Sequence, residues 1–548
     1  MLARGPAVGW RVCHPAVALL LLLLLLLGTG RLALAQQRTG GSSGAGEGGV
    51  YRRPLGNDPT TLDPASIRDT YSLSVVQQIF DGLVRFDQTL NVTPALAQFW
   101  RASRDGLIWT FTLRKGVKFH NSREVTADDV VYSFTRILDP KTKSGAADLF
   151  LGIQGATAFR QGKAPAVSGL VAIDRYTVQV TLIEATVPFV SILGVGQAKI
   201  VPKDLTEQSG PRFGSQPIGT GPFKFVRWEP GSEIVLTANA DYFDGAPRLS
   251  RLVFRLFPGE QLESVVREFQ AGGLEDSPVP SKDYRQILAS HRYQYVRRPM
   301  FNLRHYGFNT AMKPLDDRRV RQALILAIDR ESIVEDDFLG RFSLARGILP
   351  PGTMGYNPKV MGYPFDPVKA RELLIQAGYP GGRGLPPLSF WAGVRSEGIL
   401  REHDRIRRNL GAIGVSVEFH YLTDWPTFSR QMEERKLPIF LHGWNADVPD
   451  PDNFLFKLFY SKSPRNYMSY SNPAVDRLLL QARAEQDPTR RVDLYRRAEE
   501  QILEDAPIIP IWHQTYERLF QPYVKNVEVS GLGDSYIAFR KVWLERPQ

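Results

Sequence analysis

The sequence predicts an α/β protein of two or three lobes, because of its length, its hydrophobic periodicity and the order of its predicted strands and helices. The chain has 548 residues, which is more than one hydrophobic core usually organises. Hydrophobic residues make up 43% and charged residues 23%, proportions that are ordinary for a globular protein and give no sign of general disorder. Strand-like alternation dominates the first part, and helices that alternate with strands dominate the second.

The first part of the chain is predicted to be rich in strands. In residues 109–119 (WTFTLRKGVKF), apolar and polar side chains alternate from 109 to 114, which is typical of a half-buried strand, and a turn is expected at 115–116; residues 176–182 alternate again. Between them, Thr126 with Asp129 three positions later forms a pattern like a capping box and predicts the start of a helix.

Helices become frequent in the second part. Apolar residues recur at helical spacing at Val320, Ala323, Leu324, Ala327 and Ile328. Residues 366–378 predict a second helix with Asp366 as N-cap, Pro367 at the first position and Gly378 at the end.

Two further helices and two strands complete this part. The helices cover residues 472–482 and the segment from Pro488 to about Ile502, and the strands cover residues 415–422 and 436–444. This alternation predicts an α/β lobe, and we find no internal repeat.

The N-terminus has the pattern of an export signal. Arg4 and Arg11 precede a leucine-rich run that is too short for a comfortable membrane span, and the sequence ALA at 33–35 fits a cleavage site near Ala35. Residues 1–35 are therefore predicted to be a signal peptide of a periplasmic protein, with a retained anchor as the alternative. Residues 36–50 are rich in glycine and serine and predict a flexible tether.

Cysteine content and charge exclude several classes of function. Cys13 is the only cysteine and lies in the leader, so the mature chain has neither disulfides nor thiolate ligands. The leader holds three arginines and no acid, which leaves a mature net charge of 11 − 3 = +8. The excess is scattered, and the mixed-charge segment 401–409 is expected to be a solvated helix face, so nucleic-acid binding is not expected.

No catalytic, metal or cofactor motif stands out. The eight histidines form no H-E-x-x-H pair, and the only G-x-S-x-G match lies in the tether at 40–44. Residues 219–225 (GTGPFKF) start like a phosphate loop, but Pro222 removes a donor and no helix follows, so a tight turn into a strand is expected. We therefore predict no catalytic residue, no metal and no cofactor.

The chain resembles the peptide- and nickel-type extracytoplasmic solute-binding proteins of ABC importers, family 5, which include the dipeptide- and oligopeptide-binding proteins. The resemblance runs from about residue 55 to about residue 543 and rests on nine segments in the family's order. They include IFDGLVRFD (79–87), PIGTGPF (217–223), GFNTAMKPLDDRRVRQALILAIDRESI (307–333), LPPGTMGYNP (349–358), GWNADVPDPDNFL (443–455) and AEEQILEDAPIIPIWH (498–513).

The resemblance implies a fold of the periplasmic-binding-protein type II kind, with two lobes, an extra inserted domain and a ligand cleft between the lobes. The expected boundaries are domain I at 51–75, 196–265 and 513–548, the domain II insertion at 76–195, and domain III at 266–512. Lobe closure around a ligand is a known mode of this class, for which periplasmic binding proteins are the standard example. The implied partners are a small peptide and the permease subunits of an ABC importer, with the binding protein as a monomer.

The resemblance also implies the ligand-binding residues. In peptide-binding relatives, the acid in the segment matching WNAD holds the ligand's α-amino group, and Asp447 occupies this position. A carboxylate at a strand end, without competing cations around it, offsets the desolvation of an ammonium group. The main chain of Gly443, Trp444 and Asn445 is expected to pair with an extended peptide, with Trp444 as a wall of the cleft.

The resemblance also implies a residue that binds the carboxylate end of the ligand. Arg395, in the segment FWAGVRSEG, matches the arginine that dipeptide-type relatives use for the ligand's carboxylate, although the segment is shorter here. Asp450 and Asp452 are expected to be turn and cap residues.

The expected function is capture of di- to oligopeptides outside the inner membrane for import, without chemical change. A nickel chelate, haem, an opine or a glycoside in the same fold remains an alternative. An exported hydrolase, and a receptor or chaperone without transport, are further alternatives.

Overall fold

The computed structural model describes residues 48–259, 261–280 and 284–545. The predicted signal peptide and most of the predicted tether lie outside these residues. Strand β1 (Val50–Leu55) begins at the point where the sequence predicts that the folded part starts. Within the described ranges, no helix is both long enough and apolar enough to span a bilayer.

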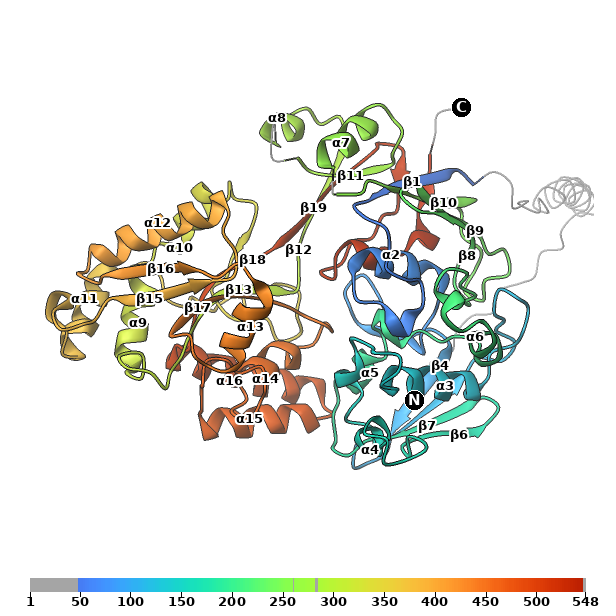
Figure 1. The fold of residues 1–548 in the computed structure, drawn as a ribbon, viewed down its shortest axis with the longest axis horizontal. Coiled ribbons are helices and arrows are strands. Elements are labelled where there is room, and N and C mark those ends of the chain that lie inside the picture. Colours follow the sequence, from blue (N-terminus) through green and yellow to red (C-terminus); the bar gives the residue numbers. More distant parts are fainter. Residues whose placement is uncertain (1–47, 260, 281–283, 546–548) are drawn as a thin grey trace, which may run out of the picture. The chain divides into compact units, whose positions relative to one another are not determined.

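The first sheet joins the beginning of the described chain to a segment two hundred residues later (Figure 1). Its strand order is β1-β10-β9-β8, with β8 (Phe223–Glu229), β9 (Glu233–Ala238) and β10 (Arg251–Leu256). β1 runs parallel to β10. Its core also includes helix α2 (Thr70–Ile79) and the C-terminal segment with the short helix η7 (Asp534–Tyr536) and strands β20 (Val524–Lys525) and β21 (Trp543–Leu544).

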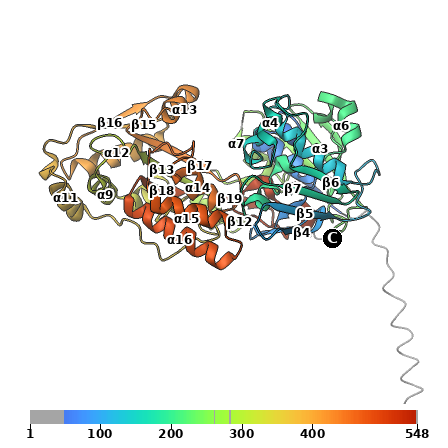
Figure 2. The same cartoon turned by 90° about the horizontal axis from the view of Figure 1, so that it is seen from below.

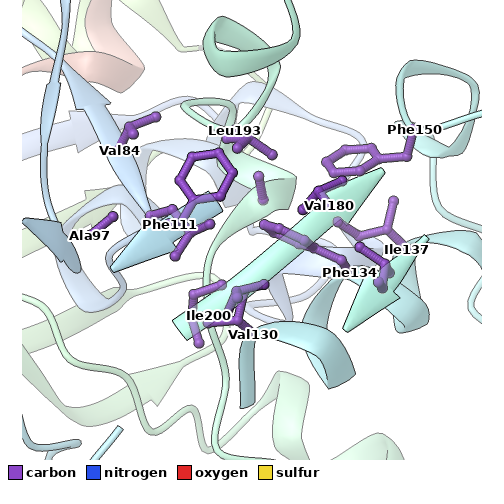
Figure 3. Packing of buried hydrophobic residues seen from close by; sticks show 14 of the residues in the cluster. Val84, Ala97, Phe111, Val130, Phe134, Ile137, Phe150, Val180, Leu193 and Ile200 are labelled. Atoms are coloured by element: carbon purple, nitrogen blue, oxygen red, sulfur yellow. The ribbon is translucent and has the colours of Figure 1, made fainter. Parts of the chain in front are cut away.

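A second, antiparallel sheet has the order β4-β5-β7-β6 and is visible in Figure 2. Its strands are β4 (Ala97–Ala102), β5 (Ile108–Leu113), β6 (Leu170–Asp174) and β7 (Thr177–Thr181). Helix α3 (Ala127–Leu138) packs on it, and Phe111 and Val180 meet Phe134 in the core shown in Figure 3. Smaller elements nearby are β2 (Val84–Phe86), β3 (Val92–Pro94), α4 (Ala156–Arg160), α5 (Phe189–Ile192) and α6 (Lys203–Ser209).

The third sheet is the largest, with six strands in the order β14-β18-β13-β17-β15-β16. The strands are β13 (Asn302–Phe308), β14 (Ser343–Leu344), β15 (Leu388–Ala392), β16 (Val417–Tyr421), β17 (Ile439–Asn445) and β18 (Ile508–His513). Successive side chains of a strand point to opposite faces, so each strand contributes side chains to two hydrophobic cores.

Different helices cover the two faces of this sheet. One face packs on α9 (Arg318–Ala327), α11 (Pro367–Gln376) and α12 (Glu397–Gly411), with the short α10 (Arg330–Ser332) after α9. The other packs on α13 (Trp425–Glu433), α14 (Asp452–Phe459), α15 (Pro473–Ala484) and α16 (Pro488–Asp505).

A three-stranded sheet combines two strands that lie between the first and third sheets in the chain with one strand that follows the third sheet. It consists of β11 (Asp276–Pro278), β19 (Thr515–Phe520) and β12 (Gln294–Pro299), with β19 in the middle. Helices α7 (Leu262–Gln270) and α8 (Tyr284–Ala289) accompany it. Because β12 runs into β13 and β18 runs into β19, the chain passes twice along this sheet.

The predicted elements are found close to their predicted limits. Asp129 accepts the N–H of Thr126 at 2.9 Å, which confirms the pair that opens α3. Asp366 caps α11 by accepting the N–H of Lys369 at 2.9 Å, and Gly378 has a positive φ of 93° just after the helix. α15 and α16 both extend beyond their predicted ends, to Ala484 and Asp505.

The expectation of a solvated helix face at 401–409 is wrong in part. In α12, the side chains of Glu402 and His403 are buried. Glu402 accepts the hydroxyl hydrogen of Tyr306 at 2.6 Å, and His403 Nδ1 lies 2.8 Å from the hydroxyl of Tyr421. The sequence does not indicate that these two residues are buried, because the hydrogen-bonding partners that compensate their burial lie on strands distant in the chain.

Glu499, buried in α16, makes stability depend on pH. Its Oε1 accepts the N–H groups of Ile348 at 2.7 Å and Leu349 at 2.9 Å, while burial raises its pKa from 4.5 to about 7. Between these two values the folded state holds a proton that the unfolded state releases. We therefore expect the free energy of unfolding to fall by about 3 kcal/mol from pH 4.5 to 7 and to level off above pH 7.

The variant Glu499→Gln isolates this contribution. Glutamine keeps an acceptor for the two N–H groups but does not titrate. Urea unfolding at several pH values is expected to give a flatter profile for the variant between pH 4.5 and 7. Identical slopes for the two proteins would contradict the assignment.

Candidate functional site

Strand β17 carries three of the predicted ligand-binding residues along an edge that is only partly paired. It pairs with β13 over its whole length, from Ile439 opposite Phe308 to Asn445 opposite Asn302. On its other side it pairs with β15 only at Ile439 and Phe440. Among the described strands, none pairs with that edge at Gly443, Trp444 and Asn445, so its main-chain groups are available to an added strand.

Asn453, at the start of α14, fixes the end of this strand. Its Oδ1 accepts both the indole N–H of Trp444 and the main-chain N–H of Asp447, each at 3.2 Å. Its Nδ2 donates to the carboxylate of Asp447 at 3.4 Å. Asn453 is buried and holds Trp444 and Asp447 in one arrangement. Sequence reasoning missed it, although it belongs to the same quoted segment.

The carboxylate of Asp447 is accessible but has a cationic partner. Its side chain is 45% exposed, and Lys457 Nζ donates to its Oδ2 at 2.8 Å. The expectation that Asp447 is free of competing cations is therefore wrong. The physical reason is that α14 carries Lys457 back to the strand end, where it also lies 5.8 Å from the ring of Trp444. An incoming ammonium group has to share Asp447 with Lys457 or displace it.

Tyr536, at the end of η7, lies within electrostatic reach of Asp447. Burial raises the pKa of Tyr536 to about 12, and the negative charge of Asp447 acts in the same direction. The ring of Phe86, from β2, is 6.2 Å from the ring of Tyr536. Tyr536 and Phe86, which are distant in the sequence, therefore both lie near the residues that follow β17.

Asp534, two residues before Tyr536, lines two cavities. The larger has a volume of about 850 Å³ and the smaller about 410 Å³, and both are also lined by Pro278 and Arg518. These volumes lie in the range of small-ligand sites. Arg53 and Arg518 donate to the Asp534 carboxylate, at 3.0 and 2.5 Å. Burial acts to raise its pKa, but the two arginines outweigh it and hold the pKa below its usual value.

Asp450 and Asp452 face the protein interior and not the strand edge. Asp450 accepts the N–H of Asp452 at 2.9 Å, which confirms its role in a turn. It also forms a two-pronged, buried ion pair with Arg491, at 2.9 and 2.7 Å. Asp452 is the first residue of α14 and pairs with Arg483 at 3.1 Å. These ion pairs tie the loop that carries Asp447 to α15 and α16.

Arg395 lies in the exposed loop between β15 and α12. Its guanidinium is 5.7 Å from the ring of Tyr421 and lies away from the hydrogen bonds that Asp447 forms with Asn453 and Lys457. Because β15 and β17 are parallel, the segments that follow them leave the same edge of the sheet. Arg395 and Asp447 therefore share that edge, and the role of Arg395 stays a prediction.

The titratable side chains of this region form no metal centre. Within the described ranges, no group of three or more His, Cys, Asp or Glu side chains has the arrangement needed to hold an ion.

Comparison with known protein families identifies the family of this chain. The family described as bacterial extracellular solute-binding proteins, family 5, matches residues 91–466. The chain belongs to this family. Solved structures of periplasmic binding proteins share its mixed α/β architecture, which confirms the predicted fold class.

Family 5 relatives cover almost the whole chain. Heme-binding protein A of Haemophilus influenzae is 31% identical over 89% of this chain and 90% of its own length. The dipeptide-binding protein of Escherichia coli is 29% identical over 92% of this chain and 94% of its own length. The structure of the periplasmic binding protein DppA from Helicobacter pylori, in complex with the peptide STSA, has a TM-score of 0.70 at 29% identity. That match covers 91% of this chain and 98% of the other.

Proposed function

We propose that this protein is the substrate-binding component of an ABC importer and captures short peptides with a free amino terminus. The observation that carries the proposal is an accessible carboxylate, Asp447, at the end of a strand edge that is left unpaired from Gly443 to Asn445. The dipeptide-binding relative and the peptide-bound structural neighbour support the same assignment.

The binding mode follows from main-chain chemistry. An extended peptide adds to the edge of β17 through hydrogen bonds that do not depend on its side chains. Its ammonium group takes the place of Lys457 on Asp447, and Trp444, fixed by Asn453, forms a wall beside it. Water fills the remaining space around varied ligand side chains. This mode gives broad specificity for sequence and strict dependence on the amino terminus.

The cellular role follows from the family. We propose a monomeric, periplasmic protein that uses its cleaved leader for export and passes ligand to membrane permease subunits without altering it chemically. The three-domain division at 51–75, 76–195, 196–265, 266–512 and 513–548 belongs to this proposal, with the ligand cleft between the lobes. The hydrophobic cores support it, because the main clusters draw on different segments.

Haem is the second candidate ligand. The relative named heme-binding protein A favours it, because its similarity extends over nearly the full length of both chains. The relatives described above are not named for a nickel chelate, an opine or a glycoside. Haem has no α-amino group, so it would not depend on Asp447 through an ammonium contact.

Titration calorimetry with matched ligands tests the proposed function. Trialanine, its N-acetylated form and haem are titrated separately into the purified protein. We expect trialanine to bind and N-acetylation to weaken binding by at least about tenfold, as expected for loss of a charge-assisted hydrogen bond. Binding of haem alone, or equal affinity for free and acetylated peptide, would contradict the proposal.

A further inference from the structure

Arg304 is on β13, the strand that pairs with β17, and its side chain is on the sheet face opposite to that of Trp444. Its Nε and Nη2 are shielded from solvent, and within the described part of the chain neither has a hydrogen-bond partner. Unpaired, buried N–H groups of a charged side chain are costly. An arginine whose donors are unpaired can bind a planar anion, because its forked N–H groups match the two oxygens of a carboxylate.

The strand register places Arg304 next to the proposed peptide edge. Arg304 is directly opposite Gly443 on the antiparallel strand β17, so the two residues share one face of the sheet. A Cβ added to Gly443 would meet no atom within 4 Å, so the space on this face is open. The missing side chain of Gly443 leaves room for the arginine to rotate and expose its shielded donors.

An aromatic platform and a buried acid complete the surroundings of Arg304. The guanidinium lies 5.3 Å from the ring of Trp512, which stacks on Phe342 at 4.1 Å. Glu402 is the nearby acid, since Arg304 opposes the rise in its pKa that burial causes. No ion pair joins them; Glu402 instead accepts the hydroxyl hydrogen of Tyr306. The charge of Arg304 is therefore only partly balanced.

The spacing along β17 suits one short ligand. Asp447 follows Gly443 by four residues, and β17 ends at Asn445 between them, so the two positions are at most about 13 Å apart at about 3.3 Å per extended residue. An extended tripeptide spans about 10 Å, and the arginine side chain covers the remainder. A ligand held by its ammonium group at Asp447 can thus present its carboxylate to Arg304.

We propose that Arg304 binds the terminal carboxylate of the peptide and so selects tripeptide-sized ligands with a free C-terminus. This inference rests on the proposed function. It assigns the contact to a residue other than Arg395, which is exposed and stacked beside Tyr421. Arg304 has shielded donors and an open space opposite, so its bond to a carboxylate is less screened by water.

The test compares trialanine with its C-terminal amide by calorimetry on the full-length mature protein. Wild-type protein is expected to bind the amide about 10- to 100-fold more weakly than the free acid. Arg304→Met is expected to bind the free acid as weakly as wild type binds the amide, with no further loss on amidation. Arg304→Lys is expected to retain part of the discrimination, because it keeps the charge without the fork.

A matched control separates the carboxylate contact from a general effect of losing a stacked arginine. Arg292 lies 5.3 Å from the ring of Tyr293, the same distance as Arg304 from Trp512, but it is exposed and outside the site. Arg292→Met is expected to discriminate between acid and amide as wild type does. Thermal unfolding of each variant establishes that it is folded.

The outcomes distinguish this inference from the proposed function. If Arg304→Met still prefers the free acid by the wild-type factor, or if only Arg395→Met removes that preference, the inference is overturned while peptide binding stands. If wild-type protein binds neither trialanine nor its amide, the proposed function fails and the inference falls with it.

Discussion

Replacing Asp447 with asparagine is expected to weaken the binding of a free-amine tripeptide by about 2–5 kcal/mol, the cost of removing one partner of a desolvated charge pair. Asparagine keeps the size of the side chain and an acceptor oxygen but loses the charge. In the variant, Asn453 Oδ1 can still accept the main-chain N–H of residue 447, a hydrogen bond of 3.2 Å in the native protein. Calorimetry with trialanine measures the difference, and binding of the N-acetylated peptide is expected to change little.

Lys457→Met provides the opposite control. Lys457 Nζ lies 2.8 Å from the carboxylate of Asp447, and both side chains are partly exposed. Exposed pairs of this kind contribute up to about 1 kcal/mol, so their loss in the variant is expected to strengthen ammonium binding by no more than that. If both Asp447→Asn and Lys457→Met left the affinity for the free-amine peptide unchanged, Asp447 would not be the ammonium site.

Replacing Asp450 with alanine is expected to lower the free energy of unfolding by about 3–5 kcal/mol, because it leaves the buried charge of Arg491 without its partner. The side chains of Arg491 and Asp450 are only 3% and 5% exposed, and two hydrogen bonds join them. Burial acts to lower the pKa of Arg491, but its acidic and hydroxyl neighbours, Asp450 first among them, outweigh burial and raise the pKa above its ordinary value. Urea unfolding followed by circular dichroism gives the change.

An exposed ion pair on the same helix is the matched control. Arg497 and Asp493 of α16 lie 3.7 Å apart, and their side chains are 58% and 67% exposed. Asp493→Ala is expected to change the free energy of unfolding by less than about 1 kcal/mol. Comparable losses for Asp450→Ala and Asp493→Ala would show that burial does not set the strength of the Arg491 pair.

The link between the two predictions is the loop after β17. Asp450 anchors this loop to α16 and Asp452 anchors it to α15, while Asp447 remains at the surface. A loop tied at its far end holds a short charged side chain in place at lower entropic cost on binding. We therefore expect Asp450→Ala to weaken peptide binding as well, to a smaller extent than Asp447→Asn.

The sequence by itself determined the features that depend on neighbours along the chain. Two helix starts are set by hydrogen bonds within one turn: Asp129 accepts the N–H of Thr126, and Asp366 accepts the N–H of Lys369. Alternation in 109–119 and 415–422 located β5 and β16, because side chains of a strand face opposite sides in turn. Order along the chain also made the family resemblance recognisable, and through it Asp447 was singled out.

Only the tertiary structure decided which side chains meet. Lys457 reaches Asp447 across a turn and the start of α14, Arg491 reaches Asp450 from 41 residues away, and Arg304 lies opposite Gly443 from another strand. No local pattern encodes these contacts, because each depends on how strands and helices pack and on which charges that packing removes from water. Local hydrogen bonds and periodicity fix the elements, whereas the balance of charge at the site is a property of the assembled fold.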